Sequence, residues 1–331
     1  MEKEKRIFHG DCNVELANQR LGKLPSAPPW REFKNKKNRE QRGEKYQASE
    51  HEIEMVNAAL YLRRPLLITG KPGAGKSSLA YAVAHELGLG DVMVWPITSK
   101  SMLQDGLYSY DAIGRLQEAS LAKKNQEGAN DLPDIGRFIR LGPIGSAFLQ
   151  SKDQKPCVVL IDEIDKSDID LPNDLLHLFE EGEFEVQELS RLPKEGAQKN
   201  IDVFAYGTLG KLPVASTGLV RCNAFPLVIM TSNGEREFPP AFLRRCLRLN
   251  IQPPNEEKIA EIVNAHLDLT QENPLVEKLI QEFLVIRDTK HKEIATDQLL
   301  NAIYLLKNDI SLAEKGKLRS AIFEALSDSQ I

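Results

Sequence analysis

Cysteine is scarce in this chain, and so are long apolar runs. The 331 residues include four cysteines, which are scattered without a Cys-x-x-Cys pair. This spacing fits neither a zinc site nor a disulfide framework, and it favours reduced thiols in a protein of the cytoplasm. No apolar stretch approaches the roughly 20 residues that a helix needs to span a bilayer, so we expect no membrane anchor.

The chain also lacks a strong charge of one sign. Its net charge of −5 argues against nonspecific binding of nucleic acid by the whole chain. The exception is a basic segment at residues 31–45, which is either a solvated segment or a contact surface for an acidic partner or a neighbouring subunit. Residues 2–6 are all charged and no apolar core follows them, so we expect no secretory signal.

A glycine-rich turn is the most informative feature that is present. It lies between an apolar run and a helical pattern, and it has the spacing Gly70-x4-Gly75-Lys76-Ser77. A loop of this kind turns its backbone N–H groups toward the phosphates of a nucleotide. The lysine can place an ammonium near the β and γ oxygens, and the serine hydroxyl can ligate Mg²⁺. The turn therefore predicts a nucleotide site at the start of a helix.

A second motif is an apolar run that ends in acids. Residues 157–161 are apolar without alternation, which is typical of a strand buried on both faces. Asp162 would hold the Mg²⁺ water shell, and Glu163 would polarise the water that attacks the γ-phosphate. Asp165 is either part of this centre or a solvated or helix-capping acid. The residues that we expect to bind the nucleotide are Gly70, Lys71, Pro72, Gly73, Ala74, Gly75, Lys76, Ser77, Ser78 and Asp162, of which Ser77 and Asp162 bind the metal.

Further apolar runs predict the fold. Segments 92–97, 226–231 and 246–251 read as strands with helices between them, and Pro96 indicates either an edge strand or the end of a strand. This order predicts an α/β fold with a doubly wound parallel sheet, in which ligands bind at the carboxyl ends of the strands. Ser49 begins a capping-box pattern for a helix before the first strand.

The chain divides by composition into three parts. Residues 1–48 form a polar, irregular arm, 49–252 form the nucleotide-binding core, and 253–331 form an α-helical lid domain. In the lid, we expect Asn255 and Thr296 to cap helices, with further helices at 275–286 and 317–326.

Two more segments complete a pattern of four motifs. One strand ends in Thr231-Ser232-Asn233, and Arg244 and Arg245 lie just before the last strand. In this order the motifs resemble those of AAA+ ATPases over about residues 50–305, and most closely those of the MoxR-like group. The resemblance implies a P-loop NTPase core and a ring-shaped homo-oligomer, a hexamer, with ATP and Mg²⁺ bound between subunits.

The resemblance also assigns roles to the later motifs. Asn233 would bind the γ-phosphate or orient the attacking water. Arg245, or else Arg244, would reach the neighbour's γ-phosphate as an arginine finger, the alternative being a salt bridge near the edge of the sheet. The lid differs from the family pattern, because residues 295–300 contain no arginine where many AAA+ lids have one.

Two segments correspond to family insertions that line the central pore. We place these loops at about 101–140 and 184–222. The first contains Tyr108 and Tyr110 in a polar stretch, where loop packing or a contact with a partner are the two interpretations. Gly142-Pro143 matches a helix start that the family has just before the acidic strand.

The functional prediction is an ATP-hydrolysing ring that remodels or activates an unidentified client protein. The alternative is a nucleotide-dependent switch or scaffold with slow regulatory hydrolysis. A small-molecule kinase is a third hypothesis, which leaves Asn233 and the two arginines unexplained.

Overall fold

The computed structural model describes residues 7–10, 14–31, 43–124, 134–192, 200–267, 273–289 and 295–308. The helix predicted at 317–326 and most of the basic segment 31–45 lie outside the described residues.

The chain separates into two compact units. We call them the sheet unit, which comprises Ala48–Thr69 and Leu79–Asn250, and the helical unit, which comprises Met1–Gln47, Gly70–Ser78 and Ile251–Ile331. The predicted boundaries of arm, core and lid remain a prediction, which we retain as a proposal.

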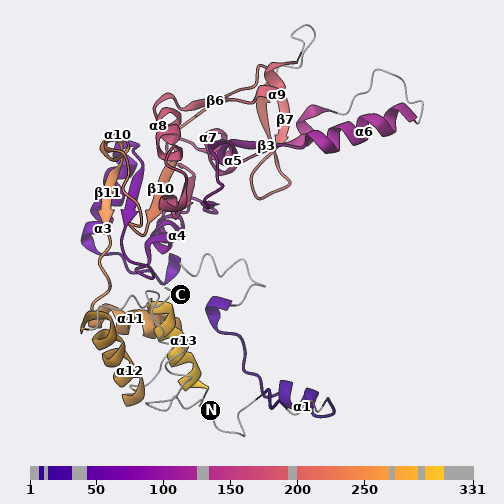
Figure 1. The fold of residues 1–331 in the computed structure, drawn as a ribbon. Coiled ribbons are helices and arrows are strands. Elements are labelled where there is room, and N and C mark those ends of the chain that lie inside the picture. Colours follow the sequence, from indigo (N-terminus) through magenta and orange to yellow (C-terminus); the bar gives the residue numbers. More distant parts are fainter. Residues whose placement is uncertain are drawn as a thin grey trace. The chain divides into compact units, whose positions relative to one another are not determined.

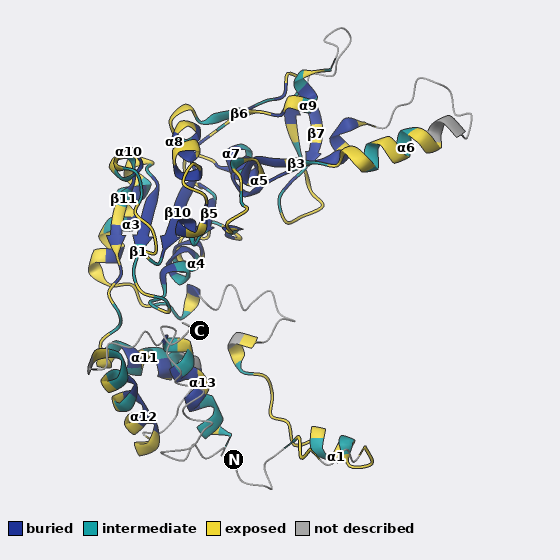
Figure 2. Ribbon diagram, in the orientation of Figure 1, coloured by how far each residue is buried: buried dark blue, intermediate teal, exposed yellow. Residues whose placement is uncertain are grey.

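A five-stranded sheet forms the centre of the sheet unit (Figure 1). Every neighbouring pair in it is parallel, as predicted. The strand β2 lies at one edge and Pro96 is its last residue, so both alternatives predicted from Pro96 are found, and β1, β5 and β10 are buried (Figure 2). In spatial order, the strands are β11 (Leu247–Asn250), β1 (Leu66–Thr69), β10 (Leu227–Ser232), β5 (Val158–Asp162) and β2 (Met93–Pro96).

Helices precede and separate these strands. The helix α3 (Glu50–Leu62) packs against β1 and β11, and its capping box at Ser49 forms as predicted. The helix α7 (Pro143–Gln150) packs against β2 and β5, with Gly142 as its N-cap and proline in its first turn. The other helices that concern the site are α4 (Lys76–Glu86), α8 (Leu171–Glu181), α10 (Pro240–Arg245) and the 3₁₀ turn η4 (Ile164–Lys166).

The two insertions contain regular structure, so the prediction of loops there was wrong. The first holds α5 (Leu103–Leu107), β3 (Tyr108–Tyr110), α6 (Ala112–Lys124), η3 (Ile135–Phe138) and β4 (Ile139–Leu141). The second holds β6 (Glu183–Glu185), α9 (Gln187–Ser190), β7 (Asn200–Phe204), β8 (Lys211–Ala215) and β9 (Leu219–Arg221). The strands β3, β4, β7 and β8 form one sheet, in which β4 and β7 are parallel and join the two insertions.

Tyr108 illustrates this correction. It lies on β3, opposite Leu141 of β4, and is buried rather than part of a polar loop. Its ring stacks on Phe184 with a centroid distance of 6.3 Å, and its hydroxyl accepts the backbone N–H of Gln187 at 3.1 Å. The tyrosine therefore packs one insertion against the other.

Three helices of the helical unit share an apolar core. They are α11 (Glu256–Leu267), α12 (Pro274–Leu284), which continues as the π-helical turn η5 (Val285–Thr289), and α13 (Thr296–Lys307). Asn255 caps α11 as predicted, because its Oδ1 accepts the N–H of Lys258 at 2.9 Å. Thr296 is the first helical residue and not a cap. Ala295 precedes the helix, and the Gln298 side chain accepts the backbone N–H of Ala295 at 2.9 Å.

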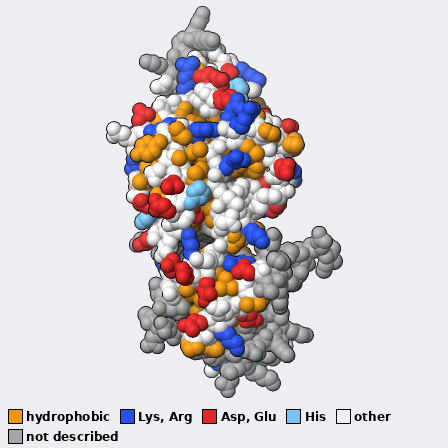
Figure 3. Space-filling view, turned by 90° about the vertical axis from the view of Figure 1, so that its left-hand side faces the viewer, with side chains coloured by type: hydrophobic (Ala, Val, Ile, Leu, Met, Phe, Trp, Pro, Cys, Tyr) orange, Lys and Arg blue, Asp and Glu red, His pale blue; other side chains and the backbone are white. Residues whose placement is uncertain are grey.

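The N-terminal arm is less irregular than predicted. It contains the short helix α1 (Ala17–Leu21), none of whose residues is buried, and the 3₁₀ turn η2 (Pro29–Arg31). On the face drawn in Figure 3, lysine and arginine side chains of the described residues are interspersed with acidic ones. No helix in the described part of the chain has the length and hydropathy that crossing a membrane requires.

Candidate functional site

The predicted phosphate loop connects β1 to α4. Its residues Gly73 and Gly75 have φ values of 76° and 87°, which favour glycine. A Cβ on Gly73 would lie 2.7 Å from the Cβ of Ala295, and one on Gly75 would lie 3.1 Å from a ring carbon of Tyr46. Within the helical unit, the loop is thus held closely between the start of α13 and the ring of an arm residue.

Lys76 is the buried cation of this loop. Its side chain folds back, and the Nζ donates to the carbonyl oxygens of Gly70 at 2.7 Å and Lys71 at 3.0 Å. Only 7% of the residue is exposed, so the ammonium is directed into the loop and not toward solvent. An anion that enters the loop can take over these contacts as charge-assisted hydrogen bonds.

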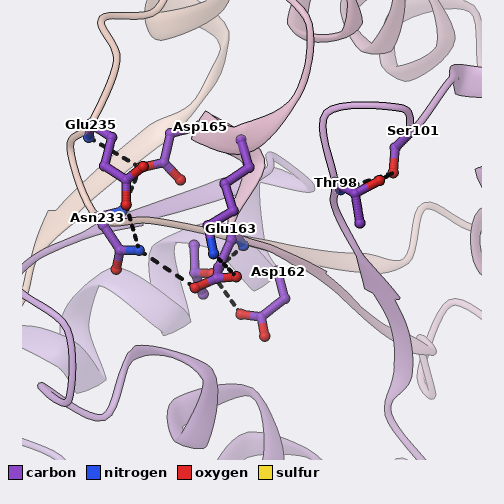
Figure 4. Close-up of polar contacts among 9 residues, drawn as sticks. Thr98, Ser101, Asp162, Glu163, Asp165, Asn233 and Glu235 are labelled. Atoms are coloured by element: carbon purple, nitrogen blue, oxygen red, sulfur yellow. Dashed lines mark hydrogen bonds and ion pairs between the residues drawn. The ribbon is translucent and has the colours of Figure 1, made fainter. Parts of the chain in front are cut away.

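The acidic centre lies at the carboxyl ends of β5 and β10 (Figure 4). A hydroxyl joins the two strands there: Thr231 Oγ1 donates to Asp162 Oδ1 at 2.7 Å and accepts the backbone N–H of Glu163 at 2.9 Å. Thr231 is 1% exposed. Its hydroxyl therefore fixes both the carboxylate at the end of β5 and the start of the following turn.

Glu163 has a left-handed backbone, with φ of 61° and ψ of 49°. For a residue other than glycine this conformation costs on the order of 1–3 kcal/mol, and such strain is found where the surroundings fix it. Its carboxylate lies between two nitrogens: Lys166 Nζ is 2.6 Å from Oε2, and Asn233 Nδ2 is 3.5 Å from Oε1. The contact with Glu163 is the main cause that raises the pKa of Lys166.

Asp165 is buried and bonded, and so is neither a solvated acid nor a helix cap. Its Oδ2 accepts the backbone N–H groups of Asn233 at 2.8 Å and Glu235 at 3.2 Å. Only 3% of the residue is exposed. The carboxylate holds the segment after β10 against the turn after β5, and this contact places Asn233 beside Glu163 (Figure 4).

The two arginines of α10 differ in what they contact. Arg245 forms an ion pair with Glu180 of α8, as the salt-bridge alternative predicted. Arg244 is exposed, and no described residue accepts a hydrogen bond from its guanidinium. The Arg64 guanidinium donates to the carbonyl oxygens of both residues, so their backbone is fixed while the Arg244 side chain faces solvent.

The metal prediction is compatible with this chemistry. No group of three or more His, Cys, Asp or Glu side chains in the described part of the chain could hold an ion alone. Mg²⁺ in nucleotide sites needs only one or two protein oxygens, because phosphates and water supply the rest. Asp162 and Ser77 are oxygen donors of the required kind, although they belong to different units.

The comparison with protein families decides the identity of the core. Residues 66–253, more than half of the chain, match the ATPase family associated with various cellular activities (AAA). The chain belongs to the AAA family. Its α/β fold of the P-loop NTPase type agrees with the predicted fold class.

Comparisons with whole proteins add little to the AAA assignment. No curated protein matches the chain. A crystal structure of NtrX from Brucella abortus in complex with ATP has 13% sequence identity and a TM-score of 0.43, over 83% of this chain and 55% of that chain. A second NtrX structure from the same organism has 12% identity and a TM-score of 0.42, over 82% and 54%. The chain thus spans about half the length of these proteins.

Sequence reasoning named Asp165 as a candidate for this centre but missed two contributors, the hydroxyl of Thr231 and the ammonium of Lys166. The hydroxyl contacts Asp162 and Glu163, the ammonium pairs with Glu163, and the Asp165 carboxylate holds the backbone at Asn233. Thr231 and Asp165 lie within the two motifs, but only the pairing of β5 with β10 shows what they contact.

Proposed function

We propose that this AAA protein hydrolyses ATP with Mg²⁺ and works as a ring that remodels or activates a partner protein. The observation that carries the proposal is the contact between Glu163 and Asn233, beside Asp162, at the carboxyl edge of a parallel sheet. A carboxylate and an amide placed together at this edge suit a base and a donor that orient one water molecule.

Each group then has one task. Lys76 exchanges its carbonyl partners for phosphate oxygens, and the backbone N–H groups of residues 70–78 bind the same phosphates. Asp162 and Ser77 are the residues that would hold Mg²⁺, and the ion would neutralise negative charge on the phosphates. Glu163 accepts a proton from the attacking water, and Asn233 donates to that water or to the γ-phosphate.

The arginine that completes the site would come from a neighbouring subunit. We propose Arg244 for this role ahead of Arg245, because the Arg245 guanidinium is already paired with Glu180. An exposed guanidinium on a helix of fixed backbone can approach a neighbour's nucleotide without first breaking an ion pair.

Ring assembly, the MoxR-like role and the client belong to the same proposal. Its support is the pair of insertions, which add a second sheet with the exposed residue Leu209 between β7 and β8. Buried or half-buried free cysteines support the cytoplasm as the compartment.

The alternative is a nucleotide switch in which hydrolysis is slow and regulatory. One observation favours it: both oxygens of the Glu163 carboxylate contact a nitrogen, so the base is engaged in ion pairing and hydrogen bonding.

The test is steady-state ATPase activity as a function of protein concentration, with Mg²⁺, for wild type and Glu163→Gln. We expect specific activity to rise as subunits assemble and to vanish in Glu163→Gln, which still binds a fluorescent ATP analogue. Glu54→Gln, an exposed acid on α3, is the control and should behave as wild type. Equal turnover in Glu163→Gln and wild type would remove Glu163 from the mechanism, and tight binding without turnover in wild type would favour the switch.

A further inference from the structure

The turn after β5 holds a lysine against the proposed catalytic base. Lys166 lies three residues after Glu163, and its Nζ is 2.6 Å from Glu163 Oε2. The other oxygen, Oε1, faces the Asn233 amide at 3.5 Å. Both oxygens of the carboxylate therefore contact a nitrogen donor (Figure 4).

The backbone fixes this arrangement. Glu163 is the N-cap of the 3₁₀ turn η4 and Lys166 is its last residue, a three-residue spacing that places the two side chains on the same side. Thr231 holds the N–H of Glu163, and Asp165 is held by the backbone of residues 233 and 235. The two ends of the ion pair thus project from a turn that is anchored at two points.

The charges around Lys166 favour its ammonium form. The contact with Glu163, followed by the charges of Glu235 and Asp165, raises the pKa of Lys166. The ion pair between Lys166 and Glu163 can break and form again, because 42% of each side chain is exposed to solvent. Lys166 can therefore swing away into water without unfolding the turn.

We propose that Lys166 is a positioning residue that restrains Glu163, and that turnover requires its ammonium to leave the carboxylate. A general base needs an oxygen that can approach the attacking water, and an ammonium at 2.6 Å occupies one of the two. This inference rests on the proposed ATPase function and adds a regulatory step to it. A neighbouring subunit or client that offers Lys166 another acid would release the base.

The expected effect follows from the strength of an exposed ion pair. Such pairs shift a population by about two- to five-fold, so removal of the ammonium should raise kcat by about that factor. KM for ATP should change little, because Lys166 contacts the carboxylate and not the phosphate loop.

The experiment compares Lys166→Met, Lys166→Gln and Lys166→Arg with wild type in steady-state ATPase assays. We expect a higher kcat with unchanged KM for Met and Gln, and the wild-type kcat for Arg, which restores the ion pair. Lys152→Met, an exposed lysine elsewhere in the sheet unit, is the matched control. Thermal unfolding verifies that the variants remain folded.

Two outcomes overturn the inference: an unchanged kcat in Lys166→Met and Lys166→Gln, or a kcat that falls. A gain that persists in Lys166→Met combined with Glu163→Gln would also exclude an action through Glu163. The proposed ATPase function fails separately, through Glu163→Gln alone, if that variant hydrolyses ATP at the wild-type rate.

Discussion

Replacing Thr231 with valine tests the architecture of the acidic centre most directly. Valine has nearly the same shape, but it removes the hydroxyl that donates to Asp162 at 2.7 Å and accepts from Glu163 at 2.9 Å. Thr231 is 1% exposed, so water cannot readily replace the lost groups. An unsatisfied buried polar group costs about 1–3 kcal/mol. Because both partners are only half-buried, we take about 2 kcal/mol for the pair.

This cost has two measurable consequences. The midpoint of thermal unfolding should fall by about 4–8 °C, since 1 kcal/mol corresponds to about 2–4 °C in a domain of 150–250 residues. The Glu163 carboxylate also loses its backbone anchor, and a displacement of about 1 Å in a catalytic group can reduce the rate by about 10²-fold. ATP binding should persist, because the phosphate loop is not altered.

Circular dichroism melting and steady-state ATPase assays measure the two effects. Thr231→Ser is the matched control, because it keeps the hydroxyl and loses only a methyl group, worth about 0.8 kcal/mol. If Thr231→Val and Thr231→Ser had the same melting temperature and the same kcat, the hydroxyl would not organise the centre.

The remaining predictions concern the loop, the finger and the thiols. Lys76→Ala should abolish binding of a fluorescent ATP analogue, and retained binding would refute the phosphate-loop assignment. Arg244→Ala should reduce kcat by up to about 10³-fold and regain activity when mixed with Glu163→Gln subunits. Arg245→Ala should reduce kcat less, and the reverse ranking would assign the arginine finger to Arg245. Burial raises the pKa of Cys246 to about 12, above its ordinary value of 9.0, so its stabilising contribution is complete below pH 9.0 and lost as pH rises toward 12. Melting temperatures from pH 8 to 11 should therefore fall more steeply in wild type than in Cys246→Ala, and parallel curves would contradict this.

The fold was accessible from the sequence because its strands are continuous apolar runs. Residues 158–161 show no alternation of apolar and polar side chains, as expected for a strand with both faces covered. Pro96 fits an edge strand because proline has no backbone N–H to donate to a neighbouring strand. The loop at Gly73 and Gly75 was predictable because both residues have positive φ values, which residues other than glycine rarely adopt.

The rest depended on contacts between segments far apart in the chain. Tyr108 belongs to a strand only because β4 follows some 30 residues later, and no local pattern indicates this pairing. Glu163, whose backbone is left-handed, likewise donates its N–H to the hydroxyl of Thr231 on a neighbouring strand, a contact that no local pattern indicates. The pairing of Arg245 with Glu180 brings α10 to α8, which sequence spacing does not encode.

The parallel pairing of β4 with β7 has a structural consequence for the molecule. The pair is reinforced at Arg140, whose guanidinium lies over the Phe204 ring and donates to the carbonyl oxygens of Ala205 and Thr208. The β7–β8 hairpin is therefore attached to β4 by backbone pairing and by this side chain. β4 leads directly into α7, and α7 packs on the strand that ends at Asp162, so packed elements connect the two insertions to the acidic centre. Because the two insertions share one sheet, removal of either would leave an unpaired strand edge in the other.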